Sequence, residues 1–300
     1  MTNKEKIIKE TSLGKIIWSD SSDYLLKLKD NTVDLIITSP PFALTKEKAY
    51  GNKKGEEYLT WLKDFGEIFF NKLAPTGSLV IDFGGSWVPG SPTRNLHQFK
   101  IPIIFVEELG FNLAQEFFWW NTGKMPSPAE WVTKSRERVT DAANYIFWFS
   151  KSLHPKANNR NILGPYSDAM KRMIKNKKYN TNKRPGGQNI SKVWANDNGG
   201  SIPHNVIPYG NTYNDPYFAY CEKKGLTKHP ARFGPFIPEF FIKFLTDEGD
   251  LVVDPFAGSC TTGSVAEQLN RKWICIDSNE EYLQGGKGRF IKEFSFEVKK

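Results

Sequence analysis

Two short segments at opposite ends of the chain carry groups that could do chemistry together. One is Thr-Ser-Pro-Pro-Phe at 38–42, and the other is Asp-Pro-Phe-Ala-Gly-Ser at 254–259. Each closes an apolar run that is typical of a buried strand. Because open α/β sheets bind their ligands at the carboxyl ends of strands, the two segments predict two ligands that meet at one edge of a sheet.

The first segment offers hydrogen-bond acceptors on a stiff backbone. Pro40 and Pro41 fix φ and remove two N–H donors, which leaves the carbonyl of Pro40 as an outward-facing acceptor. The hydroxyl of Ser39 is a second acceptor, and the ring of Phe42 is a face on which a nucleobase could stack. This set suits an exocyclic amino group. Taken alone, the segment also fits a rigid strand-to-loop turn with a buried Phe42.

The second segment has the features of a nucleoside-binding loop. Gly258 lets the backbone approach a ligand, and the helix start that follows favours a negative group. Asp277 ends the next apolar run, where an acidic residue usually binds ribose hydroxyls. The segment is not GxGxxG, and Asp254 would repel a pyrophosphate but attract an ammonium. A ligand with a ribose, a carboxylate and an ammonium is S-adenosylmethionine; the alternative is a plain strand-to-helix turn with a surface Asp254.

Alternating strands and helices must hold the two segments in place. Periodicity predicts strands at 15–18, 34–38, 78–83, 111–120, 143–149, 250–253 and 273–276. It predicts helices at 22–28, 56–73, 99–109, 238–245, 261–269 and 280–290. This alternation favours an α/β fold with a doubly wound, mostly parallel sheet, completed by an aromatic antiparallel pair of strands.

The stretch 151–228 interrupts the pattern. It carries 14 Lys and Arg against four Asp and Glu, whereas the rest of the chain is close to neutral. Its cations are interleaved with Tyr, Trp and Asn, which suit contacts with phosphates and bases. We interpret it as a region that recognises nucleic acid, with Arg160, Arg184 and Lys192 as candidate contacts. The alternative is a solvated loop region with one possible helix at 166–177.

Further cations outside this stretch could contact DNA. Lys46 and Lys53 lie in the loop after Phe42, where they could close over phosphates, although a solvated loop is an equal alternative. Lys124 and Arg136 are two more candidates. The net charge of +8 favours a polyanionic partner.

The cysteines and the apolar runs limit the cellular setting. Three cysteines without a CxxC pattern predict a reducing compartment and no structural metal. The charged N-terminus is unlike a signal peptide, and no apolar run has the length of a membrane span. We therefore expect a cytoplasmic protein with no membrane partner.

Three motifs of the chain resemble those of the S-adenosylmethionine-dependent DNA amino-methyltransferases. Residues 39–42 resemble their catalytic motif in its N4-cytosine form, 254–259 their cofactor loop, and 229–233 (His-Pro-Ala-Arg-Phe) a further cofactor-binding segment. The order of the motifs resembles the β class. The resemblance implies a Rossmann-like, seven-stranded sheet in the order 3-2-1-4-5-7-6. It implies a catalytic half at 1–150, an inserted DNA-recognition region at 151–228 and a cofactor-binding half at 229–300.

The resemblance also assigns residues to the cofactor. Asp277 would hold the ribose hydroxyls, Asp254 would meet the methionine ammonium and Phe256 would pack beside the adenosine. Asp20 would reach the adenine amino group, with a helix N-cap as the alternative. The other implied contacts are Pro255, Gly258, His229, Arg232 and Phe233. Many relatives have Gly at position 260; Cys260 is small, so we expect cofactor binding to survive.

The implied activity is methyl transfer to N4 of cytosine in duplex DNA. Ser39, Pro40, Pro41 and Phe42 would hold a flipped base. The chain would act as a monomer, beside a restriction endonuclease but without a stable complex. N6-adenine methylation by the same apparatus and a non-catalytic DNA-binding regulator remain alternatives. C5-cytosine chemistry is disfavoured because it needs a cysteine after a proline, and a nicotinamide dehydrogenase is disfavoured by the glycine pattern.

Overall fold

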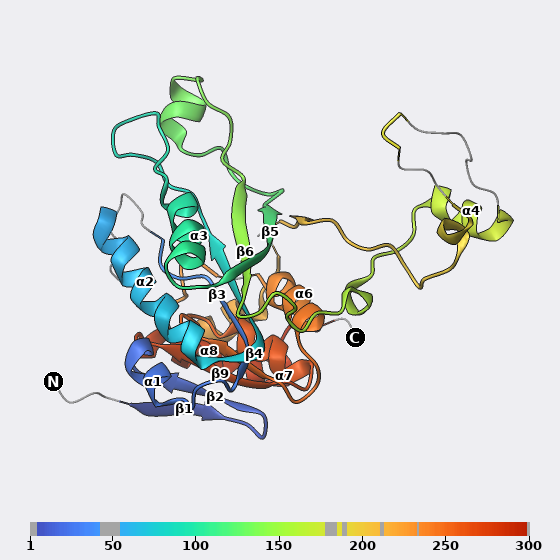
Figure 1. Cartoon of the computed structure of the whole chain (residues 1–300). Helices are drawn as coiled ribbons and strands as arrows, with labels where there is room; N and C mark the ends of the chain where they lie inside the picture. Colours follow the sequence, from blue (N-terminus) through green and yellow to red (C-terminus); the bar gives the residue numbers. More distant parts are fainter. Residues whose placement is uncertain are drawn as a thin grey trace. The chain divides into compact units, whose positions relative to one another are not determined.

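The computed structural model describes most of the chain. The described residues are 5–42, 55–177, 185–187, 191–210, 213–232 and 234–298. Their strands join into one mixed sheet (Figure 1). The strands are β1 (Lys6–Glu10), β2 (Gly14–Trp18), β3 (Val33–Thr38), β4 (Leu73–Phe83), β5 (Asn112–Trp120), β6 (Ala143–Ser150), β7 (Val206–Pro208), β8 (Leu251–Asp254) and β9 (Lys272–Asp277).

The sheet has the strand order that the family resemblance implies, with one strand added at each edge. The nine strands of the described residues run β1-β2-β9-β8-β3-β4-β6-β5-β7. Numbered cyclically from β8, the middle seven follow the order 3-2-1-4-5-7-6. β6 is antiparallel to β4 and β5, and β1 is antiparallel to β2. The remaining pairs are parallel, which confirms the mostly parallel sheet but corrects the count of seven strands.

Helices cover both faces of the sheet. They are α1 (Ser21–Lys27), α2 (Gly55–Lys72), α3 (His97–Glu107), α4 (Asp168–Asn176), α5 (Pro216–Lys224), α6 (Phe236–Leu245), α7 (Thr261–Gln268) and α8 (Glu280–Gly286). All but α4 and α5 contribute to the two buried clusters that line the sheet. Within the described part of the chain, no helix is long and apolar enough to cross a membrane.

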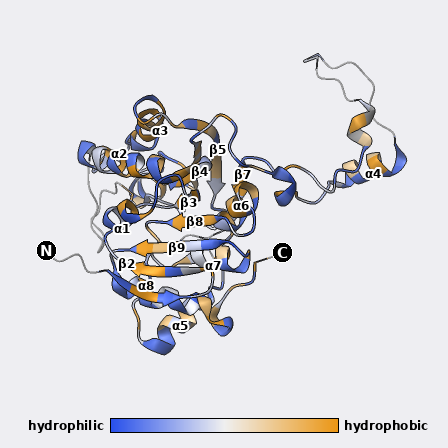
Figure 2. Ribbon diagram, turned by 60° about the horizontal axis from the view of Figure 1, so that its bottom comes forward, coloured by the Kyte–Doolittle hydropathy of each residue, from blue (hydrophilic) through white to orange (hydrophobic). Residues whose placement is uncertain are grey.

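Successive side chains of a strand point to opposite faces of the sheet, and this alternation produces the two buried clusters. Ile16 and Ile37 belong to a buried cluster with side chains of α6, α7 and α8. Their chain neighbours Ile17 and Ile36 point to the opposite face and pack with α1, α2 and α3. Figure 2 shows hydrophobic residues along β2, β8 and β9, between helices. The sheet is therefore doubly wound, which is the fold class predicted from the alternation.

The chain divides into two compact units. The larger comprises residues 1–157 and 205–300, and the smaller is Asn158–His204. The smaller unit holds α4, and a bridge between Gly164 and Ser201 joins its two ends. Residues 205–228, which we placed in the basic region, belong to the larger unit and form β7 and α5.

The sequence patterns missed three elements for identifiable reasons. β1 is a short edge strand whose charged residues hide its two isoleucines, and β7 is a three-residue edge strand that ends in Pro208. α5 lies in a Tyr- and Asn-rich stretch, although its end signals are present. Asp215 caps its first turn by accepting from the N–H of Tyr217, and Gly225 ends it at φ 63°.

Candidate active site

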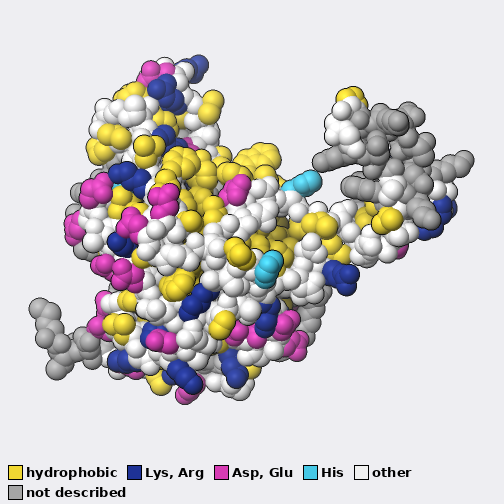
Figure 3. All heavy atoms as spheres, viewed as in Figure 1, with side chains coloured by type: hydrophobic (Ala, Val, Ile, Leu, Met, Phe, Trp, Pro, Cys, Tyr) yellow, Lys and Arg dark blue, Asp and Glu magenta, His cyan; other side chains and the backbone are white. Residues whose placement is uncertain are grey.

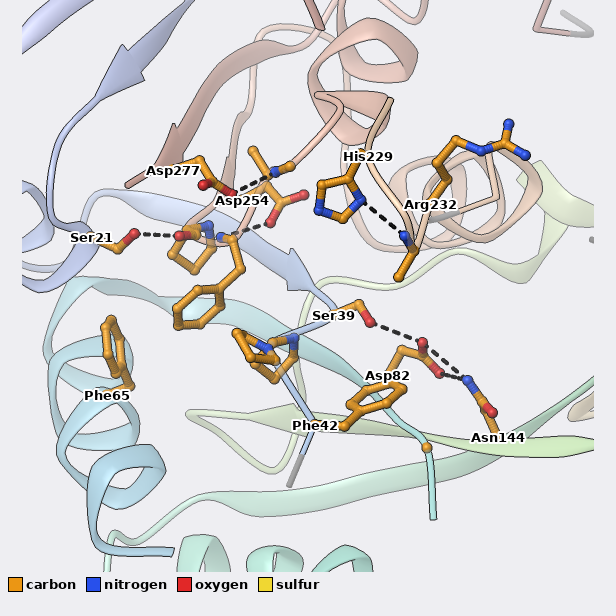
Figure 4. A pocket seen from close by; sticks show the side chains of 18 of the residues that line it. Ser21, Ser39, Phe42, Phe65, Asp82, Asn144, His229, Arg232, Asp254 and Asp277 are labelled. Atoms are coloured by element: carbon orange, nitrogen blue, oxygen red, sulfur yellow. Dashed lines mark hydrogen bonds between the residues drawn. The ribbon is translucent and has the colours of Figure 1, made fainter. Parts of the chain in front are cut away.

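The two segments that open the sequence argument lie side by side. They follow β3 and β8, which are neighbouring parallel strands. The hydroxyl of Thr38 donates to Asp254 across the gap, with 2.7 Å between Thr38 Oγ1 and Asp254 Oδ1. Figure 4 shows Ser39 and Phe42 on one side of the cleft, and Asp254 and Asp277 on the other. The predicted meeting of two corners at one sheet edge is present in the structure.

One cleft collects the candidate residues. Its volume is about 1010 Å³. Its lining includes Ser39, Pro40, Pro41, Phe42, Asp20, Asp254, Pro255, Phe256, Gly258, Asp277, His229 and Arg232. Phe233 lies outside the described residues. Since pockets for single small ligands hold about 300–1,000 Å³, this cleft has room for a nucleoside-sized ligand and a second, smaller one.

Asp254 joins the two corners as a buried carboxyl. Its Oδ1 accepts from Thr38 and from the N–H of Phe256, and its Oδ2 accepts from Thr262 Oγ1 at 2.6 Å. Burial raises the pKa of Asp254 to about 6, although these hydrogen bonds oppose the rise. The contacts fix the turn from β8 into α7. The contact of Asp254 with an ammonium stays a prediction.

Asp277 and Asp20 shape the other wall of the cleft. Asp277 accepts from the N–H of Gly258 at 2.8 Å and from that of Asn279 at 2.9 Å, and burial raises its pKa. Asp20 caps α1 by accepting from the N–H of Ser22 at 2.9 Å, which is the alternative that the sequence left open. Asp20 is also exposed to the cleft, so its contact with an adenine stays a prediction.

Aromatic side chains of α2 complete this half of the cleft. The ring of Phe256 lies 5.5 Å from that of Trp61 and 5.0 Å from that of Phe65, centroid to centroid. Both α2 residues line the cleft. The sequence argument missed them because their helical spacing is equally typical of core packing. Together the three rings form an apolar surface in the lining of the cleft.

On the other side of the cleft, Ser39 lies next to a buried carboxyl that the sequence argument missed. Thr38 of β3 pairs with Ile81 of β4, so Ser39 and Asp82 are adjacent. The hydroxyl of Ser39 donates to Asp82 Oδ2 at 3.1 Å, and the amide of Asn144 donates to both carboxylate oxygens. Figure 4 shows this chain of three residues. An acid inside the apolar run of β4 was the available signal.

The surroundings of Asp82 make its proton easy to gain or lose near neutral pH. Burial raises the pKa of Asp82 to about 7. Hydrogen bonds from Asn144 and Ser39 and the positive charge of Lys124 oppose the rise. A carboxyl with a pKa close to 7 is suited to accept a proton in a reaction.

Two glycines, Gly84 and Gly258, allow close packing around Phe42 and around the turn that follows β8. A Cβ on Gly84, at the end of β4, would lie 2.5 Å from the ring of Phe42. A Cβ on Gly258 would lie 2.8 Å from His229 Nε2, and Gly258 has a φ of 48°. Cys260 also has a positive φ, 56°, a backbone conformation that glycine adopts most readily.

A buried ion network supports the segment at 229–232. Asp215 accepts from both Arg289 and Arg232, and Arg289 Nε donates to the carbonyl of Ser259 at 2.7 Å. Burial acts to raise the pKa of Asp215, but the two guanidinium groups outweigh it and hold the pKa below its ordinary value. The N–H of His229 donates to Tyr217 Oη at 2.9 Å. These contacts join the start of α5 to the turn that follows β8, and only the folded chain reveals them.

The candidate DNA contacts are less well placed. Lys124 lines the cleft, and Arg136 is exposed in the connection between β5 and β6. Arg160 is exposed in the smaller unit. Lys46, Lys53 and Arg184 lie outside the described residues, and only the backbone of Lys192 is described. The DNA contacts of all seven residues stay predictions.

Comparisons with known proteins agree with this geometry. The type II methyltransferase M.PvuII of Proteus hauseri is 45% identical over 94% of this chain and 84% of its own. M.BglII of Bacillus subtilis is 29% identical over 90% of this chain and 67% of its own. A solved structure described as PvuII DNA methyltransferase (cytosine-N4-specific) matches with a TM-score of 0.79 and 38% identity, over 97% of this chain and 91% of that one. A family profile described as DNA methylase, N6_N4_Mtase, matches residues 33–287. The chain therefore belongs to the N6/N4 DNA methylase family.

Proposed function

We propose that this chain transfers a methyl group from S-adenosylmethionine to the exocyclic N4 of cytosine in duplex DNA. The observation that carries the proposal is the hydrogen bond from Ser39 to Asp82, in the same cleft as Asp254 and Asp277. The likeness to M.PvuII, whose solved structure is described as cytosine-N4-specific, supports the choice of base.

One half of the cleft fits the cofactor. Asp277 and Asp20 present acceptors for hydroxyl and amino groups, and the rings of Phe256, Trp61 and Phe65 present an apolar surface. Gly258 lines the cleft three residues before α7, and the N-terminus of a helix favours a carboxylate. When bound, S-adenosylmethionine supplies an electrophilic methyl group on a sulfonium.

The other half fits a cytosine that has left the helix. The face of Phe42 offers a stacking surface, while the hydroxyl of Ser39 and the carbonyl of Pro40 accept the two hydrogens of the amino group. A cytosine amino nitrogen is a poor nucleophile because its lone pair is shared with the ring. Two acceptors that hold both hydrogens favour a pyramidal nitrogen, and its lone pair then becomes available in a fixed direction.

Asp82 is the final acceptor of the proton that the amino nitrogen must lose. Ser39 Oγ takes that proton, and the hydroxyl hydrogen of Ser39 passes to Asp82 Oδ2, which is 3.1 Å away. The amide of Asn144 holds the carboxylate in place for this step. Ser39 and Asp82 thus act as a relay within the cleft.

The relay predicts that methyl transfer depends on pH. Only ionised Asp82 accepts a proton, and burial raises its pKa to about 7. The single-turnover rate should therefore rise as pH increases through about 7 and level off above it. Asp82→Asn should lower the plateau and remove this limb. If the same limb persists in Asp82→Asn, another group titrates and the relay is wrong.

A smaller change should test whether the position of the Phe42 ring matters for turnover. Gly84→Ala places a methyl group 2.5 Å from the Phe42 ring, so the ring must move away from the base. Since misplacement by about 1 Å can cost about 100-fold in rate, we expect a loss of about 10- to 100-fold in turnover. Binding of S-adenosylmethionine, measured by calorimetry, serves as the internal control and should stay the same. A matching loss of cofactor binding would place the damage elsewhere.

The remaining partners are part of the same proposal. The basic stretch 151–228 recognises the DNA sequence, and affinity should fall steeply with salt because phosphate contacts release counterions. A monomer suffices, since each strand of a palindromic site can be modified separately. A restriction endonuclease of the same specificity would be the companion enzyme, without a stable complex.

Sequencing of plasmid DNA from cells that express the chain tests the function and finds the site. Modification-sensitive chemistry should report one modified cytosine within one recurring sequence, and a plasmid that expresses Ser39→Ala should lack it. Unmodified DNA with clear binding by the purified chain would favour the non-catalytic regulator.

A further inference from the structure

The connection between β5 and β6, residues 121–142, leaves the sheet at the edge that holds the cleft. β5 runs in the direction of β4 and β6 runs opposite to both, so β5 ends and β6 begins at that edge. Both feet of the connection belong to the cleft wall, through Asn121 and Lys124 on one side and Asp141 and Ala142 on the other. Figure 1 shows this connection in green, projecting beyond the ends of β5 and β6.

The connection is held firmly at its base. The N–H of Asn121 donates to the carbonyl of Ala142 at 2.8 Å, and that of Asp141 donates to Ser127 at 3.1 Å. Arg94 forms an ion pair with Asp141. Arg138 Nη2 donates to the carbonyl of Pro92 at 3.1 Å. The connection would therefore keep its position when DNA binds against it.

Two apolar side chains on this projection are strongly exposed, Val139 at 86% and Met125, and of the two only Met125 directly follows a residue that lines the cleft. The relative exposure of Met125 is 78%, although methionine is among the residue types most often buried. It directly follows Lys124, so its Cα is about 3.8 Å from that of a residue in the cleft wall. Lys124 lines the cleft, and its positive charge acts on the carboxyl of Asp82. Figure 3 shows hydrophobic, basic and acidic side chains close together on this part of the surface.

We propose that Met125 enters the base stack of the DNA and fills the space that the target cytosine leaves. This inference rests on the proposed function, because it assumes a flipped cytosine in the cleft. Apolar side chains that wedge between bases are a known means of unstacking DNA, and the long, unbranched methionine adapts to such a gap. In this arrangement Lys124 binds a phosphate or an edge of the flipped base. Met125, the next residue in the chain, occupies the position that the base has left.

The test compares Met125→Ala on two short duplexes that carry the methylation site found by sequencing. In one the target cytosine faces guanine, and in the other it faces an abasic position. A cytosine without a partner leaves the stack at lower cost, so a wedge matters less there. If the wedge contributes about 1.4 kcal/mol, the single-turnover rate on the paired duplex should fall about tenfold. On the abasic duplex it should change less than about twofold.

Leu113→Ala is the matched control. Leu113 is also an exposed apolar residue, at 41%, but it lies at the start of β5, whereas the connection follows the end of β5. It should leave both rates unchanged. Equal losses of Met125→Ala on the two duplexes, or no loss on either, would overturn the wedge. A wild-type chain that methylates neither duplex would instead refute the proposed function, so the two failures are distinguishable.

Discussion

Ser39→Ala should lower turnover by about 100-fold or more and leave the affinity for S-adenosylmethionine unchanged, since removal of one preorganised transition-state contact costs about 100- to 1,000-fold. The substitution removes an acceptor for the amino group and breaks the path to Asp82, whose hydrogen bond from Ser39 spans 3.1 Å. It leaves the bond between Thr38 and Asp254 in place, so the cofactor loop keeps its support.

Single-turnover methylation and calorimetric titration with S-adenosylmethionine measure the two effects separately. Ser39→Thr, which keeps a hydroxyl, is the matched control and should retain more activity than Ser39→Ala. Equal losses of turnover and cofactor affinity in Ser39→Ala would mean that the residue supports the cofactor loop and does not act on the base.

Asp277→Ala should have the opposite profile. Its carboxylate holds the N–H groups of Gly258 and Asn279, and in our proposal it also binds the ribose. Removal of one partner of a hydrogen bond to a charged group costs about 1.5–3 kcal/mol, so affinity for S-adenosylmethionine should fall by about 10- to 100-fold. Turnover at saturating cofactor should change less.

Asp277→Asn provides the graded control because its amide oxygen can still accept from Gly258. It should bind the cofactor more weakly than the wild type but more tightly than Asp277→Ala. A variant series in which turnover falls and cofactor affinity does not would show that the roles of Asp277 and Ser39 are interchanged.

The sequence was sufficient for the parts of the fold where burial imposes a regular pattern. Strands such as β3 are buried on both faces, so Ile36 and Ile37 form an unbroken apolar run that ends next to Ser39. Helix α5 was missed because tertiary packing of Tyr217 and Tyr220 stabilises a segment with little apolar periodicity. The edge strand β1 was missed because its sequence is mostly charged. It pairs with β2 alone, and an edge strand of this kind does not need an apolar run.

The same distinction applies to the site. The places of Ser39 and Gly258 in the cleft were predictable, because both belong to loops that follow parallel strands, where ligand sites form. Asp82 and Arg289 were not, since each acts through a partner far away in the chain. Asp82 contacts Ser39 only because of the register of β3 and β4. Arg289 contacts Asp215 only because the folded chain brings these distant residues together.

Mass analysis of nucleosides tests the central claim most directly. Purified chain, S-adenosylmethionine with a labelled methyl group and plasmid DNA are incubated, and the DNA is then digested to nucleosides. We predict labelled N4-methylcytosine in the digest, and none when Ser39→Ala replaces the wild type. Labelled N6-methyladenine without N4-methylcytosine, or no labelled nucleoside at all, would contradict the account.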